Sequence, residues 1–331
     1  MKKKVFITGE AGSIGSALIE EFSKDVNYEV INNSERCKNL TVKIKNNLPF
    51  VFDYDYNGEI DITSGYILDT IFGQFRPDII IHTAAAVGTD KCEKDFEEAY
   101  RINVDGIRRL AESVKKHVPD CLFVNFSTTA TMDPEDYNCE KGIDIKTIRS
   151  PKTWYGATKY IGEIIAKFSF KNCITFLPVF LFGKYPIDTS SVFPKIFVSS
   201  LMDNKFPIKL DPAIYKQYEY LPNVVPAIKR IIENPESVGK DIVICGEERH
   251  QFSYHIEKAE KAYINKFGEE LYYELQPKED YCKHHVVSNE TFKKMLRYAK
   301  ITKEEFYKTR KPFEEAIFEV AESVPENARL L

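Results

Sequence analysis

The chain has 331 residues, of which 43% are hydrophobic and 29% are charged, and its formal net charge is -4 at pH 7. This composition is that of a globular protein, and the length accommodates one large domain or a main domain with a smaller one. The small negative charge gives no general attraction to nucleic acid or to an anionic membrane, and no apolar stretch is long enough to span a bilayer. We therefore expect a cytoplasmic protein without nucleic-acid or membrane partners.

The seven cysteines are scattered and contain no C-x-x-C pair, so we expect reduced thiols rather than disulfides or a zinc site. The pair His284-His285 has no further metal-ligating side chain close by in the sequence. Because structural and catalytic metal sites need several such ligands, we expect no bound metal.

Short apolar segments alternate with amphipathic segments of helix length through the first half of the chain, which predicts strands and helices in βαβ order. The predicted strands are 5–8, 28–32, a weaker one that ends at Asp61, 78–82, 122–127 and 174–182. The segment 79–81 shows no polar alternation, as is expected of a parallel strand covered on both faces. Apolar side chains recur at helical spacing over 97–117 and predict a helix there.

Three glycines follow the first predicted strand at three-residue spacing, in the segment TGEAGSIG at residues 8–15. Gly9, Gly12 and Gly15 allow a tight turn and a close approach of the backbone to a pyrophosphate. The N–H groups at the start of the next helix, near Ser13 and Ile14, attract negative charge. This order of strand, turn and helix predicts a dinucleotide coenzyme, and the alternative is a glycine-rich turn without a ligand.

The end of the second predicted strand bears on which nicotinamide coenzyme is bound. An acidic side chain there holds the adenosine ribose of NAD, but this chain has Asn32 and Asn33, with Arg36 close behind. Loss of the carboxylate removes repulsion toward a 2′-phosphate, with which Arg36 can pair. The sequence slightly favours NADP, while NAD held through Asn33, with Arg36 in solvent, stays open.

Tyr155 and Lys159 lie four residues apart, so on a helix they share one face. A phenol has a pKa of about 10 and carries protons poorly at neutral pH unless a nearby cation, here Lys159, stabilises its anion. Upstream, the predicted strand 122–127 ends in three hydroxyls, of which we choose Thr129 to hold a substrate oxygen. Y-x-x-x-K alone also fits a solvated tyrosine and lysine, but its place after the glycine turn and the hydroxyls favours catalysis.

These motifs resemble those of the extended short-chain dehydrogenase/reductases, or NAD-dependent epimerase/dehydratases, which mostly act on nucleotide sugars. The similarity extends over nearly the whole chain. Besides the glycine turn it rests on Asp61-Ile62, on the alanine-rich segment 82–86, on Asn103 in N-V-D-G, and on Y-G-A-T-K-Y-I-G-E at 155–163. The resemblance implies an α/β fold with a doubly wound parallel (Rossmann) sheet.

The same resemblance implies the organisation of the chain. Residues 1–183 would form the dinucleotide-binding domain, and 184–331 would form mainly a smaller mixed substrate-binding lobe, with some elements crossing back. Prolines interrupt the regular pattern in this second part. The helix at 97–117 and the helix that carries Tyr155 would form the interface of a homodimer.

The site residues also receive roles from the resemblance. Thr129, Tyr155 and Lys159 would form the catalytic triad, and Lys159 would also hold the nicotinamide ribose. The coenzyme-binding residues would be Gly9, Gly12, Ser13, Ile14, Asn33, Arg36, Asp61, Ile62, Ala84, Ala85, Asn103, Tyr155 and Lys159. The substrate-binding residues would be Thr129, Phe180, Lys216 and Lys278, with Tyr218 and Tyr220 either beside the pocket or in the core.

The chain departs from the family near the substrate. Where relatives have R-P-x-N-x-Y-G this chain has L-P-V-F-L-F-G at 177–183, and Lys216 and Lys278 stand at positions that bind the diphosphate in relatives. Each lysine fits a solvated surface cation equally well. Thr129 is not followed by the Asp-Glu pair of the 4,6-dehydratases, so we expect no dehydration.

The expected activity is NAD(P)-dependent hydride transfer at a carbon of a nucleotide-linked sugar, in polysaccharide or glycoconjugate biosynthesis. A 4-keto-sugar reductase and a sugar epimerase fit about equally, although the segment 88–93 resembles that of the reductases. A non-catalytic dinucleotide-binding regulatory or scaffold subunit is the alternative.

Overall fold

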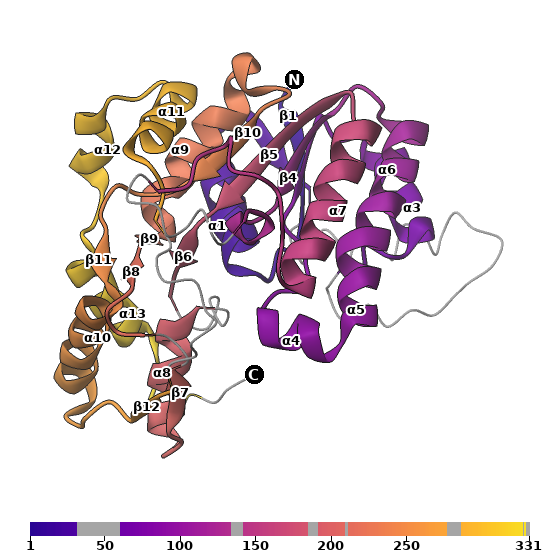
Figure 1. Ribbon diagram of the computed structural model, residues 1–331. Helices are drawn as coiled ribbons and strands as arrows, with labels where there is room; N and C mark the ends of the chain where they lie inside the picture. The colour runs from indigo at the N-terminus through magenta and orange to yellow at the C-terminus, as the bar shows by residue number, and fades with distance from the viewer. Residues whose placement is uncertain are drawn as a thin grey trace.

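The computed structural model describes residues 1–31, 60–133, 142–184, 191–208, 211–276, 286–326 and 328. A parallel sheet of six strands, in the order β10-β5-β4-β3-β1-β2, lies at its centre between two layers of helices (Figure 1). These strands are β1 (Lys3–Thr8), β2 (Tyr28–Val30), β3 (Ile79–His82), β4 (Leu122–Phe126), β5 (Asn172–Pro178) and β10 (Asp241–Ile244). The expected doubly wound α/β fold is thereby confirmed.

The predicted strand at 174–182 is wrong in one respect, because the structure divides it in two. β5 ends at Pro178, which has no N–H with which to extend the ladder. The chain then forms β6 (Phe180–Phe182), which leaves the central sheet and pairs in parallel with β9 (Tyr218–Tyr220). The predicted strand that ends at Asp61 lies mostly outside the described residues, and Ile60 and Asp61 themselves are not in a strand.

One face of the sheet is covered by α3 (Gly65–Phe75), α6 (Gly106–His117) and α7 (Trp154–Ser169). Phe6, Phe72, Ile80, Leu110 and Phe123 form part of the core on this side. Strand side chains with even and odd numbers point to opposite faces, which explains why the triplet 79–81 is apolar throughout.

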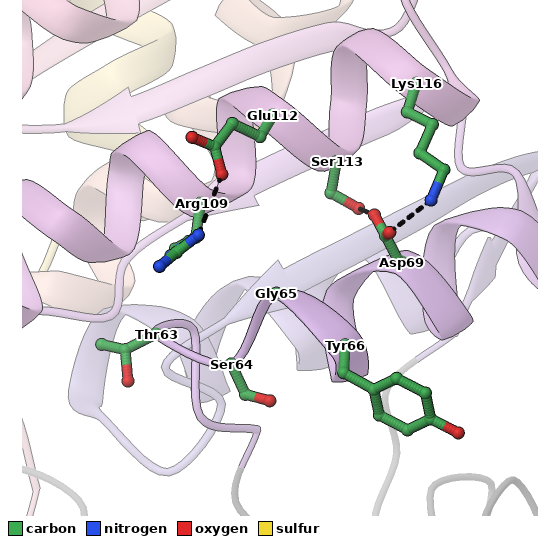
Figure 2. A pocket seen from close by; sticks show the side chains of 9 residues that line it. All are labelled: Thr63, Ser64, Gly65, Tyr66, Asp69, Arg109, Glu112, Ser113 and Lys116. Atoms are coloured by element: carbon green, nitrogen blue, oxygen red, sulfur yellow. Dashed lines mark hydrogen bonds and ion pairs between the residues drawn. The ribbon is translucent and has the colours of Figure 1, made fainter.

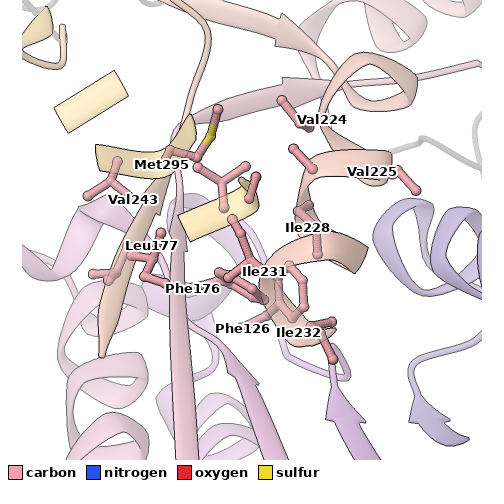
Figure 3. Close-up of a cluster of buried hydrophobic side chains, with 14 of the residues drawn as sticks. Phe126, Phe176, Leu177, Val224, Val225, Ile228, Ile231, Ile232, Val243 and Met295 are labelled. Carbon is pink, nitrogen blue, oxygen red and sulfur yellow. The ribbon is translucent and has the colours of Figure 1, made fainter. Parts of the chain in front are cut away.

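The opposite face is covered by α1 (Ser13–Ser23), α9 (Leu221–Glu233) and α11 (Asn289–Ala299). Ile228 and Ile231 of α9 are fully buried in the same core cluster as Phe126 and Phe176 of the strands (Figure 3). β10, α9 and α11 all come from the second half of the chain. Elements from beyond residue 183 therefore complete the central sheet and its cover.

The helix predicted over 97–117 has an irregular start. It consists of α5 (Phe96–Tyr100), one π-helical turn at Arg101–Asp105 and then α6. A π-turn inserts one extra residue into a helix and is often found at functional sites. Here it contains the buried Asn103, whose contacts are described below.

A smaller lobe is built from α8 (Val192–Leu201), α10 (Phe252–Phe267) and α13 (Phe313–Ser323), with short two-stranded sheets (Figure 1). Its core is aromatic and includes Phe182, Phe193, Tyr218, Phe252 and Phe313. Its other elements are β7 (Phe206–Ile208), β8 (Tyr215–Lys216), β11 (His250–Gln251), β12 (Tyr273–Leu275) and, toward the sheet, α12 (Lys303–Thr309). Among the helices described, none is long and apolar enough to cross a membrane.

Candidate active site

The glycine turn joins β1 tightly to α1 and leaves its outer side exposed. Gly9 has φ of +71°, in the left-handed region, and its carbonyl accepts from the Gly12 N–H at 3.0 Å. A Cβ at Gly15 would lie 2.1 Å from the Gly9 oxygen, so no larger residue fits there. Gly12 is exposed and precedes α1, whose first turn has no acidic side chain. The N–H groups of Ser13 and Ile14 in that first turn are suited to an anion.

A second loop packs directly on this turn. The Thr83 hydroxyl donates to the Thr8 carbonyl at 2.6 Å, and the Ala84 N–H donates to the Thr8 hydroxyl at 3.2 Å. The approach is close enough that a Cβ on Gly9 would lie 2.7 Å from the Ala84 nitrogen. Ala84 and Ala85 are both half-buried and lie beside the glycines. A shared role in binding the coenzyme would require this arrangement.

Asn103 joins this loop to α7. Its Oδ1 accepts from the Ala86 N–H at 2.8 Å, and its Nδ2 donates to the Ala86 carbonyl and to the Thr158 hydroxyl, both at 3.1 Å. These are all contacts within the protein. In this structure Asn103 therefore positions the loop against α7 rather than presenting its own amide, and its predicted contact with a coenzyme stays a prediction.

The two residues predicted beside the adenine differ in exposure. Asp61 is exposed, and its Oδ1 accepts from the Thr63 N–H at 2.9 Å and from the Thr63 hydroxyl at 2.7 Å. Ile62 is buried, and a Cβ on Gly106 would lie 2.6 Å from its Cδ1. Asn33 and Arg36 lie outside the described residues, so the preference for NADP stays a prediction.

Tyr155 and Lys159 lie on the inner face of α7, which Thr153 caps by accepting from the Gly156 N–H at 3.1 Å. Tyr155 is half-buried, whereas Lys159 is 7% exposed and its Nζ donates to the Phe126 carbonyl at 2.6 Å. Burial lowers the pKa of Lys159 to about 8. The lysine therefore lies at the end of β4, close to the predicted reacting groups.

Burial governs the pKa of Tyr155. It raises the pKa of Tyr155 to about 12, and the Thr128 hydroxyl acts in the opposite direction. The Lys159 ammonium donates to the Phe126 carbonyl. Tyr155 is therefore protonated at neutral pH, and the expectation that Lys159 stabilises its anion stays a prediction.

The three hydroxyls after β4 differ in their contacts. Ser127 donates to Glu163, the Thr128 hydroxyl accepts from the Ala130 N–H at 3.2 Å, and Thr129, which is 3% exposed, donates to the Pro178 carbonyl at 3.4 Å. The chain enters a 3-10 turn at Thr129, and this turn was not foreseen from the sequence. The Thr128 hydroxyl lowers the pKa of Tyr155, while the catalytic role assigned to Thr129 stays a prediction.

The substrate-side residues Phe180, on β6, and Lys216, on β8, come together outside the central sheet. Lys216 is 3% exposed, and its Nζ lies 4.5 Å from the centre of the Phe180 ring. The interpretation of Lys216 as a solvated surface cation is therefore wrong. Tyr218 and Tyr220 are buried in the aromatic core of the lobe, and Lys278 lies outside the described residues.

Two charged residues that the sequence reading did not single out lie behind Lys159. Glu163 is fully buried on α7, and Arg149, at 12% side-chain exposure, pairs with it at 3.4 Å. The sequence did contain a signal for Glu163, because Tyr155, Lys159 and Glu163 repeat at four-residue spacing.

A polar groove of about 550 Å³ lies elsewhere, between α3 and α6 (Figure 2). Its lining includes Thr63, Tyr66 and Asp69 on one side and Arg109 and Lys116 on the other. Asp69 is already engaged by Ser113 and Lys116. None of the predicted site residues lines this groove, so it is separate from the candidate active site.

Residues 3–202 match the family model described as the RmlD substrate binding domain. The chain belongs to this family. The "uncharacterized UDP-glucose epimerase" YtcB of Bacillus subtilis is 28% identical over 263 residues, which cover 74% of this chain and 78% of that protein. A dTDP-4-dehydrorhamnose reductase of Aggregatibacter actinomycetemcomitans is 28% identical over 182 residues, 55% of this chain and 53% of that protein, so the match spans about half of that reductase.

Solved structures of low sequence identity share the fold of this RmlD-family protein. The UDP-glucuronic acid 4-epimerase of Bacillus cereus, in complex with UDP-glucuronic acid and NAD, superposes with a TM-score of 0.75 at 19% identity. The superposition covers 97% of this chain and 98% of that one. This superposition shows the shared fold, and the resemblance to extended short-chain dehydrogenase/reductases is confirmed by the family match together with the named relatives.

Proposed function

We propose that this protein is an NAD(P)-dependent enzyme that transfers hydride at a carbon of a nucleotide-linked sugar, as a 4-keto-sugar reductase or a sugar epimerase. The observation that carries this proposal is the half-buried Tyr155, one helical turn from the buried Lys159, whose ammonium lies at the end of β4. The names of the relatives support the substrate class, because both an epimerase and a reductase of nucleotide sugars are among them. The proposal includes a role in polysaccharide or glycoconjugate biosynthesis in the cytoplasm.

The described residues fit a dinucleotide. The exposed Gly12 and the first N–H groups of α1 would hold the pyrophosphate, and Ala84 and Ala85 would lie along its path. Lys159 would hold the nicotinamide ribose. The bound nicotinamide would supply the hydride or accept it.

The protein's own contribution is the handling of one proton. With its pKa raised to about 12 by burial, Tyr155 holds its proton at neutral pH and can donate it to a substrate carbonyl oxygen as that oxygen gains negative charge. The hydroxyls of Thr128 and Thr129, which follow β4, would hydrogen-bond the same oxygen.

Two measurements test this proposal. Saturable binding of NADPH or NADH, followed by fluorescence, is expected for the wild type and is expected to weaken in Gly12→Val. The only atom within 4 Å of a Cβ at Gly12 is the Gly9 oxygen, at 3.3 Å, so the valine would mainly enter the space of the coenzyme. If neither NADPH nor NADH binds, the proposal is overturned.

The second measurement adds UDP-, dTDP-, GDP- and CDP-linked sugars and 4-keto-sugars. Stoichiometric loss of the NADPH absorbance selects the reductase, and product without net loss selects the epimerase. Coenzyme binding without turnover across this panel would instead favour the regulatory or scaffold subunit.

We also propose a homodimer through α7 and α5. Ile161, Ile164 and Phe168 of α7 are 37%, 40% and 89% exposed, and Phe96 and Tyr100 of α5 are 36% and 39% exposed. Apolar side chains gathered on one surface of a globular protein indicate an interaction site. Light scattering at micromolar concentration is expected to give twice the monomer mass, and only monomer in Ile164→Asp; a monomeric wild type would refute the dimer.

A further inference from the structure

A buried acidic residue stands directly behind Lys159. Glu163 follows Lys159 by four residues on α7, so the two side chains lie one above the other on the same helix face. Glu163 is 0% exposed and accepts a hydrogen bond from Ser127 at the end of β4. An isolated carboxylate in such a place would be costly, and it is retained only where other groups compensate its charge.

The second partner of Glu163 fixes its orientation. Arg149 pairs with Glu163 through Nε at 3.4 Å and with Asp241 of β10 through Nη2 at 3.6 Å. Asp241 is in turn bound by Lys167, further along α7, at 2.6 Å. Glu163 is therefore held by Arg149, which shares its charge with a second carboxylate.

The charges that face Lys159 can be named for each element around it. On α7 these are Tyr155, which is protonated at neutral pH, and Glu163. On β4 the Phe126 carbonyl accepts from the Lys159 ammonium. On β3, burial and the charge of Lys159 lower the pKa of His82 to about 3, so that His82 is neutral. Glu163 is thus the anionic group whose charge acts on Lys159, and it opposes the effect of burial.

We propose that Glu163 is a positioning residue for the reaction: its carboxylate, fixed by Ser127 and Arg149 one helical turn from Lys159, supports the charged form of this buried lysine. This inference rests on the proposed function, because it supposes that the charged lysine serves the coenzyme and Tyr155. The competing explanation is that the pair Glu163–Arg149 only fastens the segment before α7 to the helix. The two explanations predict different changes in the pKa of Lys159 when Glu163 or Arg149 is replaced.

The test is the pKa of Lys159 measured directly, by NMR of protein labelled with 13Cε-lysine, with the Lys159 resonance assigned from Lys159→Arg. In Glu163→Gln, which keeps the size and a hydrogen-bond acceptor for Ser127, this pKa is expected to fall by about 1 or more. In the matched variant Arg149→Gln the carboxylate remains and loses its competing cation, so the pKa of Lys159 is expected to stay or to rise.

Equal pKa values of Lys159 in the wild type and Glu163→Gln would overturn the proposal, and so would a fall in Arg149→Gln. If Glu163→Gln does not fold, the direction in which the pKa of Lys159 changes in Arg149→Gln still tests the proposal. This titration needs neither coenzyme nor substrate, so it can fail or succeed separately from the proposed function. With substrate in hand, the alkaline limb of the pH profile of turnover is expected to move to lower pH in Glu163→Gln and not in Arg149→Gln.

Discussion

Two groups of buried charges, one in each half of the chain, are built differently. The lobe cluster consists of Arg310, Glu219 and Glu248, with Arg310 and Glu219 at 3% and 1% side-chain exposure. Arg310 donates to Glu219 at 3.1 Å and to both oxygens of Glu248 at 2.9 and 3.2 Å. Glu219 also accepts from the backbone of Tyr220 at 3.0 Å and from the Asn223 amide. Each charge in this cluster is met by an opposite charge.

The α7 cluster, formed by Lys159, Glu163 and Arg149, is open at one end. Arg149 and Glu163 pair with each other, but the Lys159 ammonium donates to a neutral carbonyl, and a half-buried phenol lies one turn away. A buried charge alone is weak evidence for function, because structural pairs perturb pKa values as well. The comparison indicates that a buried cation without an anion in direct contact, beside a proton donor, is the more informative feature.

The strongest way to test the comparison is to remove the proton donor beside the α7 cluster. Tyr155→Phe keeps the ring and deletes the hydroxyl, so turnover is expected to fall by a factor of about 10² to 10⁴. Coenzyme affinity and the unfolding midpoint are expected to stay near the wild-type values. Steady-state kinetics with the substrate found in the panel measures the effect, and full activity of Tyr155→Phe would refute the mechanism.

Much of the fold could be predicted from the sequence because its signals are local. The apolar triplet in β3 and the glycines after β1 each determine their own structure within a few residues. The break at Pro178, which sends β6 to β9, could not be predicted as a pairing. The paired residues of β6 and β9, such as Phe180 and Tyr218, are 38 apart in the sequence, and the tertiary packing of the lobe brings the two strands together.

The candidate site could also be predicted where its signals are local. The contacts that depend on tertiary packing could not be predicted. The spacing of Tyr155 and Lys159 placed both on one helix face, and the structure agrees. The contacts of the hydroxyls depended on the loop after β4, where the chain enters a 3-10 turn at Thr129 that no local spacing predicts. Arg149 was missed because its ion pairs join three segments that no local pattern connects.

Breaking the lobe cluster is expected to affect stability rather than chemistry. Arg310→Met leaves Glu219 buried without its cation, which is expected to cost about 3–5 kcal/mol of unfolding free energy. Urea unfolding measures this loss, and turnover per folded molecule is expected to remain unchanged. As the control, Arg310→Met combined with Glu219→Gln removes both charges and is expected to recover part of the stability. A double variant no more stable than Arg310→Met would show that the unpaired charge is not the cause.

The smallest expected effects concern two threonines, one in each region, that cap helices in the same way. Their replacement should still distinguish the two regions. Thr153 accepts from the Gly156 N–H at 3.1 Å at the start of α7, and Thr302 accepts from the Glu305 N–H at 3.1 Å at the start of α12. Loss of either cap, in Thr153→Ala or Thr302→Ala, is expected to cost about 1 kcal/mol of unfolding free energy. Only Thr153→Ala should also lower turnover, because Tyr155 lies in the turn that Thr153 fixes. Equal turnover in the two variants, at equal loss of stability, would mean that the start of α7 positions Tyr155 without its cap.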